Sequence, residues 1–169
     1  MGIGRHLKLF LFLGFAVAIL VFGYSVYNQV RVKNESNKAT MINCALLDLD
    51  SSRYELPKTP HAIIFFDPDC ESCKYELQDL KENEMLFKNK KVVLLSTLSI
   101  RTIKKVAQDY GLTDADFANF AKIDANDALE AFGSVALPYI LIYGANGQLV
   151  KEYKGETSAE LIAKYLRDN

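Results

Sequence analysis

The amino-acid sequence predicts one α/β domain that follows an amino-terminal membrane helix. Two observations lead to this prediction: an uncharged stretch at residues 9–30, and an alternation of strand and helix signals over the rest of the chain. The 169 residues are enough for one ordinary domain and a short extension. The composition is 50% hydrophobic and 24% charged, which excludes a chain that is disordered as a whole.

The uncharged stretch has the length of a membrane-spanning helix. As a helix, residues 9–30 would extend about 33 Å, close to the hydrocarbon thickness of a bilayer. The apolar run is longer than the core of a typical signal peptide, and no A-x-A cleavage site follows it, so an uncleaved anchor is favoured over a cleaved signal. We therefore expect an anchor at residues 1–30, a tether at residues 31–40 and a folded domain at residues 41–169.

The orientation of the anchor follows less directly from the sequence. Basic side chains flank both of its ends, so the positive-inside rule does not decide the matter. The very short amino-terminal tail favours a single-pass anchor in the cytoplasmic membrane, with the domain on its extracytoplasmic (periplasmic) side.

The charge balance differs between the two parts of the chain. The first 33 residues carry four basic side chains and no acidic one, whereas the remainder carries 16 basic and 21 acidic side chains, a net charge of −5. Such an acidic domain is a poor partner for nucleic acid, which needs a basic surface to meet its phosphates. We expect no nucleic-acid partner.

Strand and helix signals alternate throughout the domain. The run Ala-Ile-Ile-Phe-Phe at residues 62–66 is continuously apolar, as in a central strand buried on both faces, and Asn146-Gly147 is a strong hairpin signal. The predicted strands are residues 45–49, 53–56, 62–66, 92–98, 120–123, 139–143 and 148–153. The predicted helices are residues 70–87, 103–110, 127–132 and a last helix that begins with a capping box at residues 157–160.

Two cysteines stand where the predicted buried strand gives way to a helix. Cys70 would lie at the helix amino terminus, where unpaired N–H groups and the helix dipole stabilise a thiolate. Cys73 would lie about one turn later, near enough to form a disulfide with Cys70. The spacing predicts a redox-active pair in which Cys70 is the exposed nucleophile and Cys73 the resolving thiol, with no cofactor beyond their disulfide.

Other uses of a C-x-x-C pair are a static disulfide and half of a metal site. Zinc would need two more ligands, and only Cys44, His61 and carboxylates could supply them. The sequence has no second C-x-x-C and no His-x-x-x-His, so we expect no metal. Cys44 is the odd thiol of three, and the sequence predicts no role for it.

A second signal, Leu137-Pro138, comes just before a predicted strand. Proline is acceptable at the first position of any strand, so this signal has meaning only together with the cysteines. The order strand, C-x-x-C, helix, x-Pro, hairpin and final helix resembles the thioredoxin-like superfamily over residues 45–167, with a central mixed sheet flanked by helices. In that superfamily the proline is cis and lies against the cysteine pair, which implies that Leu137 and Pro138 bind the substrate chain.

Within the superfamily, the anchor, the leading hairpin and the motif C-E-x-C-K-x-E at residues 70–76 look most like the TlpA/ResA branch. Its members are membrane-anchored extracytoplasmic thiol–disulfide oxidoreductases, mostly reductants. The resemblance implies that Glu76 helps to tune the active-site thiols. Its position three residues beyond Cys73 places it on a neighbouring helical turn, where a carboxylate could relay a proton. The alternative is a solvated glutamate on the helix surface.

The sequence also departs from this branch. Asp69 stands where the family usually has tryptophan, and Ser72 replaces the common proline. Asp69 and Glu71 are candidates to modulate Cys70, because negative charge beside a thiol disfavours its thiolate and favours a reductant over an oxidant. Asp69 could instead serve only as the helix N-cap. Ile64 occupies the position where cytoplasmic thioredoxins carry a buried acid, which leaves Glu76 as its substitute.

The expected function is therefore the exchange of disulfides with client proteins, with the domain acting as a reductant that receives electrons from a membrane donor. The alternative is a binding protein on the same scaffold, either a copper carrier or a structural module of an envelope complex. Copper carriers of this fold use C-x-x-x-C with a distant histidine. The spacing here is one residue shorter, and no histidine follows His61.

Overall fold

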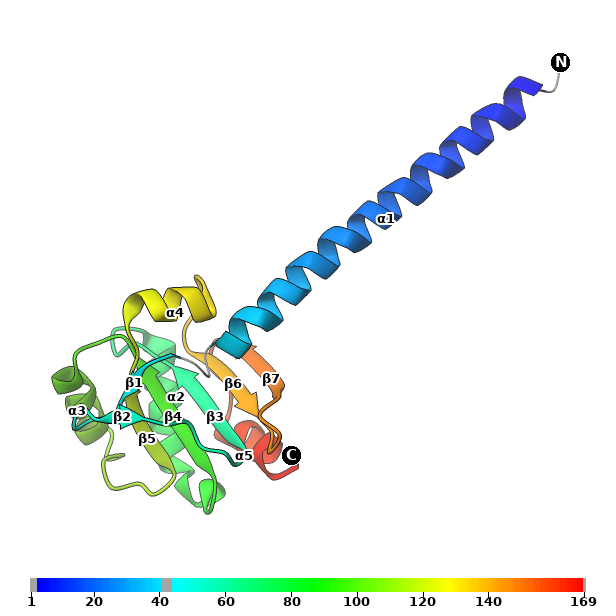
Figure 1. Ribbon diagram of the computed structural model, residues 1–169. Helices are drawn as coiled ribbons and strands as arrows, with labels where there is room; N and C mark the ends of the chain where they lie inside the picture. Colours follow the sequence, from blue (N-terminus) through cyan, green and yellow to red (C-terminus); the bar gives the residue numbers. More distant parts are fainter. Residues whose placement is uncertain (1–2, 41–43, 169) are drawn as a thin grey trace. The chain divides into compact units, whose positions relative to one another are not determined.

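The computed structural model describes residues 3–40 and 44–168. The chain divides into two units, Met1–Ala39 and Thr40–Asn169, which are described separately. The first unit is formed by helix α1 (Ile3–Thr40), whose last residue already belongs to the second unit; the helix continues through the residues expected to form a tether (Figure 1). Several apolar side chains described on this helix are exposed, among them Phe10, Phe15 and Leu20. Among the residues described, no helix combines the length and the apolar character needed to cross a membrane.

The second unit is built on a seven-stranded sheet with the order β2-β1-β5-β4-β3-β6-β7 (Figure 1). The neighbours β3, β4 and β5 are parallel, whereas β1 and β6 run antiparallel to the strands that they join. The mixed sheet that the sequence predicts is thus confirmed. Its strands are β1 (Leu46–Leu47), β2 (Arg53–Tyr54), β3 (His61–Phe65), β4 (Lys91–Ser96), β5 (Ala118–Lys122), β6 (Tyr139–Tyr143) and β7 (Leu149–Lys154).

Helices cover both faces of the sheet. Successive parallel strands from β3 to β5 step across the sheet in one direction, so right-handed connections place α2 and α3 on the same face. Side chains of α2, α3 and α5 join one core cluster, and side chains of α4 join the cluster on the other face. The helices are α2 (Glu71–Glu82), α3 (Ile100–Asp109), α4 (Ala125–Phe132), α5 (Ala159–Asp168) and the 3₁₀ helix η2 (Glu84–Phe87).

The central strands are buried on both faces, which explains their continuous apolar runs. In β3, Ile64 packs into the cluster with α2 and α5, while its neighbour Ile63 packs into the cluster with α4. Both side chains are at most 1% exposed. This burial holds β3 rigidly in the middle of the sheet. The position at which the loop after Phe65 begins is therefore fixed.

The first helix of the domain is shorter than predicted. The sequence predicts a helix through residues 70–87, but α2 ends at Glu82, and η2 follows after Asn83. The Asn83 side-chain amide donates hydrogen bonds to the backbone carbonyl and the carboxylate of Asp79, at 3.0 and 2.8 Å. A side chain that bonds to the last turn in this way competes with continuation of the helix.

The capping box expected at the start of the last helix is also wrong in its position. Helix α5 begins at Ala159, and Ser158 Oγ, not Thr157, accepts the backbone N–H of Leu161, at 3.4 Å. The Ala159 N–H is capped instead by Asp79 of α2, whose Oδ2 lies 2.6 Å away. A carboxylate from another helix thus caps the helix end together with the local Ser158, and local spacing does not reveal such a partner.

Candidate redox site

A tight turn places Cys70 at the start of α2. The Phe66 N–H continues the pairing of β3 by donating to the Leu95 carbonyl, at 2.9 Å. Asp67 Oδ1 then accepts the Asp69 N–H at 2.8 Å, and the Asp67 carbonyl accepts the Cys70 N–H at 3.1 Å. Cys70 itself is the N-cap residue, and no side chain caps the helix end. Asp69 is therefore not the N-cap, because the turn shifts that position to Cys70.

The two cysteines occupy different environments. Cys70 is half-buried, whereas Cys73 is fully buried. Burial is the main cause that raises the pKa of Cys73, to about 12. A hydrogen bond from the Asp67 backbone opposes this shift, while the Cys70 thiol and the Asp67 charge add to it. Cys73 is thus a protonated thiol at neutral pH, and only Cys70 is open to an incoming disulfide.

The x-Pro segment lies against Cys70, although 67 residues separate the two in the sequence. The Cys70 thiol donates to the Leu137 carbonyl, with 3.6 Å between Sγ and O. The Leu137–Pro138 peptide bond is cis, as the resemblance implied. On its other side, the Pro138 carbonyl accepts the N–H of Gly155 at 2.8 Å, which connects this segment to the loop before α5.

Glu76 is buried in the domain and only 2% exposed, so the alternative of a solvated surface glutamate is wrong. Its Oε2 accepts the Thr157 N–H at 2.8 Å, and its Oε1 has no hydrogen-bond partner among the residues described. Burial raises the pKa of Glu76 to about 7, the Thr157 hydrogen bond opposes this shift, and the charges of Asp79 and Glu156 add to it.

The contacts of Glu76 therefore lie toward α5. A cavity of about 340 Å³ beside it is lined by residues of α2 and of the loop before α5, among them Tyr75, Asp79 and Glu156. The groups that shift the pKa of Cys73 are Cys70 and Asp67, and Glu76 is not one of them. Sequence reasoning missed this connection of Glu76 to the loop before α5.

The two acidic residues beside Cys70 differ in their partners. Glu71 Oε1 pairs with Lys74 Nζ at 2.5 Å, and the Glu71 side chain is 75% exposed. The Asp69 side chain is exposed, and its charge also acts on Lys74, although only Glu71 forms an ion pair with that lysine. Lys74 thus offsets part of the charge of Glu71, and Asp69 is the simpler of the two carboxylates to test for an influence on Cys70.

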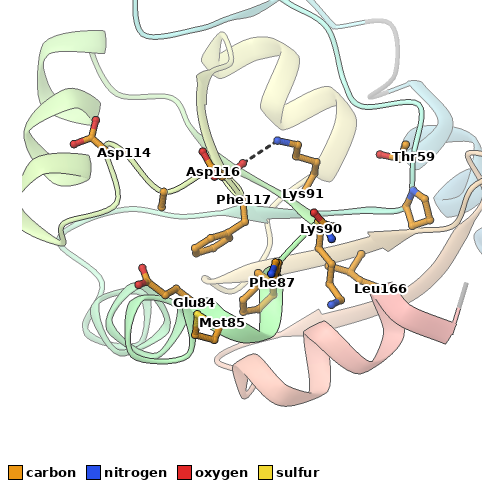
Figure 2. A pocket seen from close by; sticks show the side chains of 14 residues that line it. Thr59, Glu84, Met85, Phe87, Lys90, Lys91, Asp114, Asp116, Phe117 and Leu166 are labelled. Atoms are coloured by element: carbon orange, nitrogen blue, oxygen red, sulfur yellow. Dashed lines mark hydrogen bonds between the residues drawn. The ribbon is translucent and has the colours of Figure 1, made fainter.

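A large cavity of the domain lies away from the cysteines. It has a volume of about 960 Å³ and is lined at the opposite end of the parallel strands by residues such as Thr59, Lys91 and Phe117 (Figure 2). Lys91 Nζ donates to the Asp116 carbonyl at 2.8 Å and Lys90 Nζ to the Leu86 carbonyl at 2.7 Å, so both lysines are already bonded. Among the residues described, no group of three or more His, Cys, Asp or Glu side chains is arranged to hold a metal ion.

Comparison with known proteins agrees with this geometry. A family model described as a thioredoxin-like domain matches residues 47–169. The chain therefore belongs to the thioredoxin-like family, and the TlpA/ResA likeness fits that membership. No match was found among curated protein sequences.

Several solved structures share the fold at low sequence identity. A secreted disulfide oxidoreductase from Mycobacterium tuberculosis, homologous to E. coli DsbE, is 15% identical with a TM-score of 0.60, covering 78% of this chain and 98% of that one. The thioredoxin domain of a Bacteroides vulgatus thiol-disulfide oxidoreductase is 19% identical (TM-score 0.58, 74% and 94%). StoA from Bacillus subtilis is 14% identical (TM-score 0.53, 72% and 93%).

Proposed function

We propose that this chain is a thiol–disulfide oxidoreductase that reduces disulfides of client proteins through Cys70 and Cys73. The observation that carries the proposal is the contrast within the pair. A half-buried Cys70 stands at the uncapped start of α2, 3.6 Å from the Leu137 carbonyl, with a fully buried Cys73 one turn behind it. Disulfide exchange needs one accessible nucleophile and one protected resolving thiol.

The reaction follows from this arrangement. The Cys70 thiolate attacks one sulfur of a client disulfide, which forms a mixed disulfide and releases the other client sulfur as a thiolate that takes up a proton. Cys73 then loses its proton and attacks Cys70 Sγ, which forms the Cys70–Cys73 disulfide and releases the second client thiol. Two electrons and two protons pass from the domain to the client, and a membrane-bound dithiol donor restores the pair.

The backbone beside Pro138 supports client binding. The Leu137 carbonyl points to the Cys70 thiol, so a client chain that pairs with this segment would bring its disulfide to Cys70. Leu137 is half-buried, and Phe132 and Val135, in the segment before it, are half-buried as well. Together they offer apolar surface along the segment that leads to Leu137.

The environment of Cys73 supports reduction as the direction. Strong oxidants of this chemistry stabilise their reduced, thiolate form. Burial instead raises the pKa of Cys73 to about 12, and only one hydrogen bond, from the Asp67 backbone, acts in the other direction. On the Cys73 side, the pair therefore lacks the thiolate stabilisation that a strong oxidant has.

We also propose that residues 9–30 anchor the chain in the cytoplasmic membrane, with the domain on the extracytoplasmic side. The uncharged stretch and the exposed apolar side chains of α1 support this proposal. Membrane fractionation tests it: the chain should stay with membranes after a carbonate wash, and protease added to spheroplasts should digest the domain. Release by the wash, or protection in intact spheroplasts, would contradict it.

Replacing the resolving cysteine tests the proposed exchange directly. In the Cys73→Ser variant the mixed disulfide cannot be resolved, so full-length protein should accumulate bound to clients and migrate as reducible adducts on non-reducing gels. A matched Cys44→Ser variant should give no such adducts. If Cys73→Ser traps no partner in cells while Cys70 remains alkylatable, client exchange through this pair is ruled out.

A further inference from the structure

A third cavity lies at the amino-terminal end of β3, the end opposite Cys70. Its volume is about 450 Å³, within the range of small-molecule sites. Three segments enclose it: the start of the domain, the connection from β2 to β3, and the turn between β6 and β7. Its lining includes the side chains of Arg53, Tyr54, Pro57, Lys58, His61 and Tyr143. None of these residues takes part in the proposed redox reaction.

Aromatic rings line this cavity. His61 and Tyr143 are paired across β3 and β6, and their rings stack with centroids 5.2 Å apart and planes 16° from parallel. Both side chains are at most 5% exposed, and half-buried Tyr54 lines the cavity with them. Rings in such a lining pack well against another flat ring. Pro57 and Pro60 fix the backbone of the β2–β3 connection, so the cavity exists before a ligand arrives.

The polar atoms of the lining define which groups a ligand must carry. His61 Nδ1 lies 2.8 Å from the Thr59 carbonyl, which can only accept, so Nδ1 carries the proton. In the neutral ring Nε2 is then an acceptor, and burial lowers the pKa of His61, which favours the neutral form. The buried Tyr143 hydroxyl has no hydrogen-bond partner among the residues described. A ligand donor would complete the hydrogen bonding of His61.

Two basic side chains of the lining can meet an anion. Arg53 and Lys58 are exposed there, and Glu55 is the acidic side chain of the lining. The charges of Asp48 and Glu152 also act on the lining rings of Tyr54 and Tyr143, so an anion depends on direct contact with Arg53 and Lys58. Unlike Lys90 and Lys91 of the larger cavity in Figure 2, the side chains of Arg53 and Lys58 are not bonded to another group in the part of the chain that is described.

We propose that this cavity binds a small aromatic carboxylic acid whose ring carries a hydrogen-bond donor. The ring packs against the aromatic lining, the donor meets His61 Nε2, and the carboxylate lies near Arg53 and Lys58. The site is independent of the redox reaction, so neither proposal depends on the other.

Calorimetric titration of the full chain in nanodiscs tests the site with three matched probes. We expect 4-hydroxyphenylacetate to bind with a submillimolar Kd. Phenylacetate lacks the donor and 4-hydroxyphenylethanol lacks the charge, and each should bind about fivefold more weakly, the effect of one lost hydrogen bond or charge contact. Empty nanodiscs give the background for partition into lipid.

Variants assign the binding to the cavity. His61→Phe keeps a ring but removes the acceptor, so the preference for 4-hydroxyphenylacetate over phenylacetate should disappear. Arg53→Gln, at an exposed position that cannot disturb the core, should weaken both acids about fivefold. The matched control Lys164→Gln, on the exposed surface of α5, should change nothing. The proposal is overturned if no probe binds below about 10 mM, if the three probes bind equally, or if Arg53→Gln has no more effect than Lys164→Gln.

Discussion

The two ends of β3 present two different kinds of surface on one rigid strand. After Phe65 the chain turns sharply into α2, and Cys70 comes within 3.6 Å of a carbonyl from a distant segment. At the other end, His61 is buried, stacked on Tyr143 and hydrogen-bonded to Thr59. One end exposes a sulfur at a helix terminus, and the other encloses a cavity.

This difference shows that cavity size does not locate the chemistry of this protein. The cavities of about 960 and 450 Å³ lie away from Cys70. A client disulfide on another protein needs an accessible sulfur and a backbone edge, whereas a small ligand needs a cavity. We therefore expect the two ends of β3 to be as separate in function as they are in structure.

The largest effect is expected from removing the nucleophile. Cys70→Ser should lower the rate of disulfide exchange by about three orders of magnitude or more, because the serine hydroxyl cannot attack a disulfide at neutral pH. Cys44→Ser is the matched control and should retain the wild-type rate. The measurement is the reduction of a model protein disulfide by the full chain with dithiothreitol as electron source. Residual activity within tenfold of wild type would place the chemistry elsewhere.

A substitution in the core beside the cysteine pair should destabilise the folded domain. Phe66 is 1% exposed and packs edge-to-face on Phe120, with ring centroids 6.2 Å apart. Phe66→Ala should lower the free energy of unfolding by about 3–5 kcal/mol, measured by chemical denaturation. Leu129→Ala, at a side chain that is 63% exposed on α4, is the control and should cost less than about 0.5 kcal/mol. Similar losses in the two variants would show that Phe66 is not part of the packed core.

Glu76 should make stability depend on pH near neutrality. Its pKa is about 7 in the folded domain and 4.5 as an ordinary glutamate, so the folded state holds a proton that the unfolded chain releases between these values. Stability is therefore lost as pH rises from about 4.5 through 7, by roughly 3 kcal/mol in total.

The Glu76→Gln variant cannot titrate and should lack this loss. Its free energy of unfolding relative to wild type should thus increase by about 3 kcal/mol between pH 4 and pH 8, measured by urea denaturation with the cysteines reduced. A difference that stays constant over this range would mean that Glu76 has the same pKa in the folded domain as in the unfolded chain.

Much of the fold and part of the site could be predicted from the sequence, because they depend on local patterns. The apolar runs of β3, β4 and β6, the stop of α3 at Gly111 (φ +64°) and the turn at Gly147 (φ +72°) all follow from neighbouring residues. The cysteine pair at the start of a helix is local in the same sense. Its contact with Leu137 was implied only by resemblance, because 67 residues lie between them.

The contacts that sequence reasoning missed join separate elements. Asp79 caps α5 and Glu76 holds the Thr157 N–H, and in both cases a carboxylate of α2 bonds to backbone about 80 residues further along the chain. Residues 157–160 have the sequence of a capping box. In the structure, however, the carboxylates of Glu76 and Asp79 accept the N–H groups of Thr157 and Ala159. No spacing within the final helix could indicate that competition.

The smallest effect is expected from the charge beside Cys70. Asp69 is exposed, so solvent screens its influence, and Asp69→Asn should speed alkylation of Cys70 about two- to threefold at pH 7 and low salt. The gain should shrink in about 0.5 M salt, which screens surface charges over a few ångströms. Glu160→Gln, an exposed acidic position on α5, is the control. An equal rate for Asp69→Asn and wild type at low salt would remove Asp69 from the groups that modulate Cys70.

A redox titration of the full chain tests the central claim most directly. The chain is equilibrated in glutathione buffers of stepped potential, and its thiols are counted by alkylation and mass spectrometry. We expect one two-electron transition that joins Cys70 to Cys73, leaves Cys44 alkylatable, and has a midpoint more reducing than about −200 mV. A pair that never forms its disulfide in oxidising buffer would contradict the proposal that the chain is a thiol–disulfide oxidoreductase. A midpoint well above that value would contradict the proposal that it acts as a reductant.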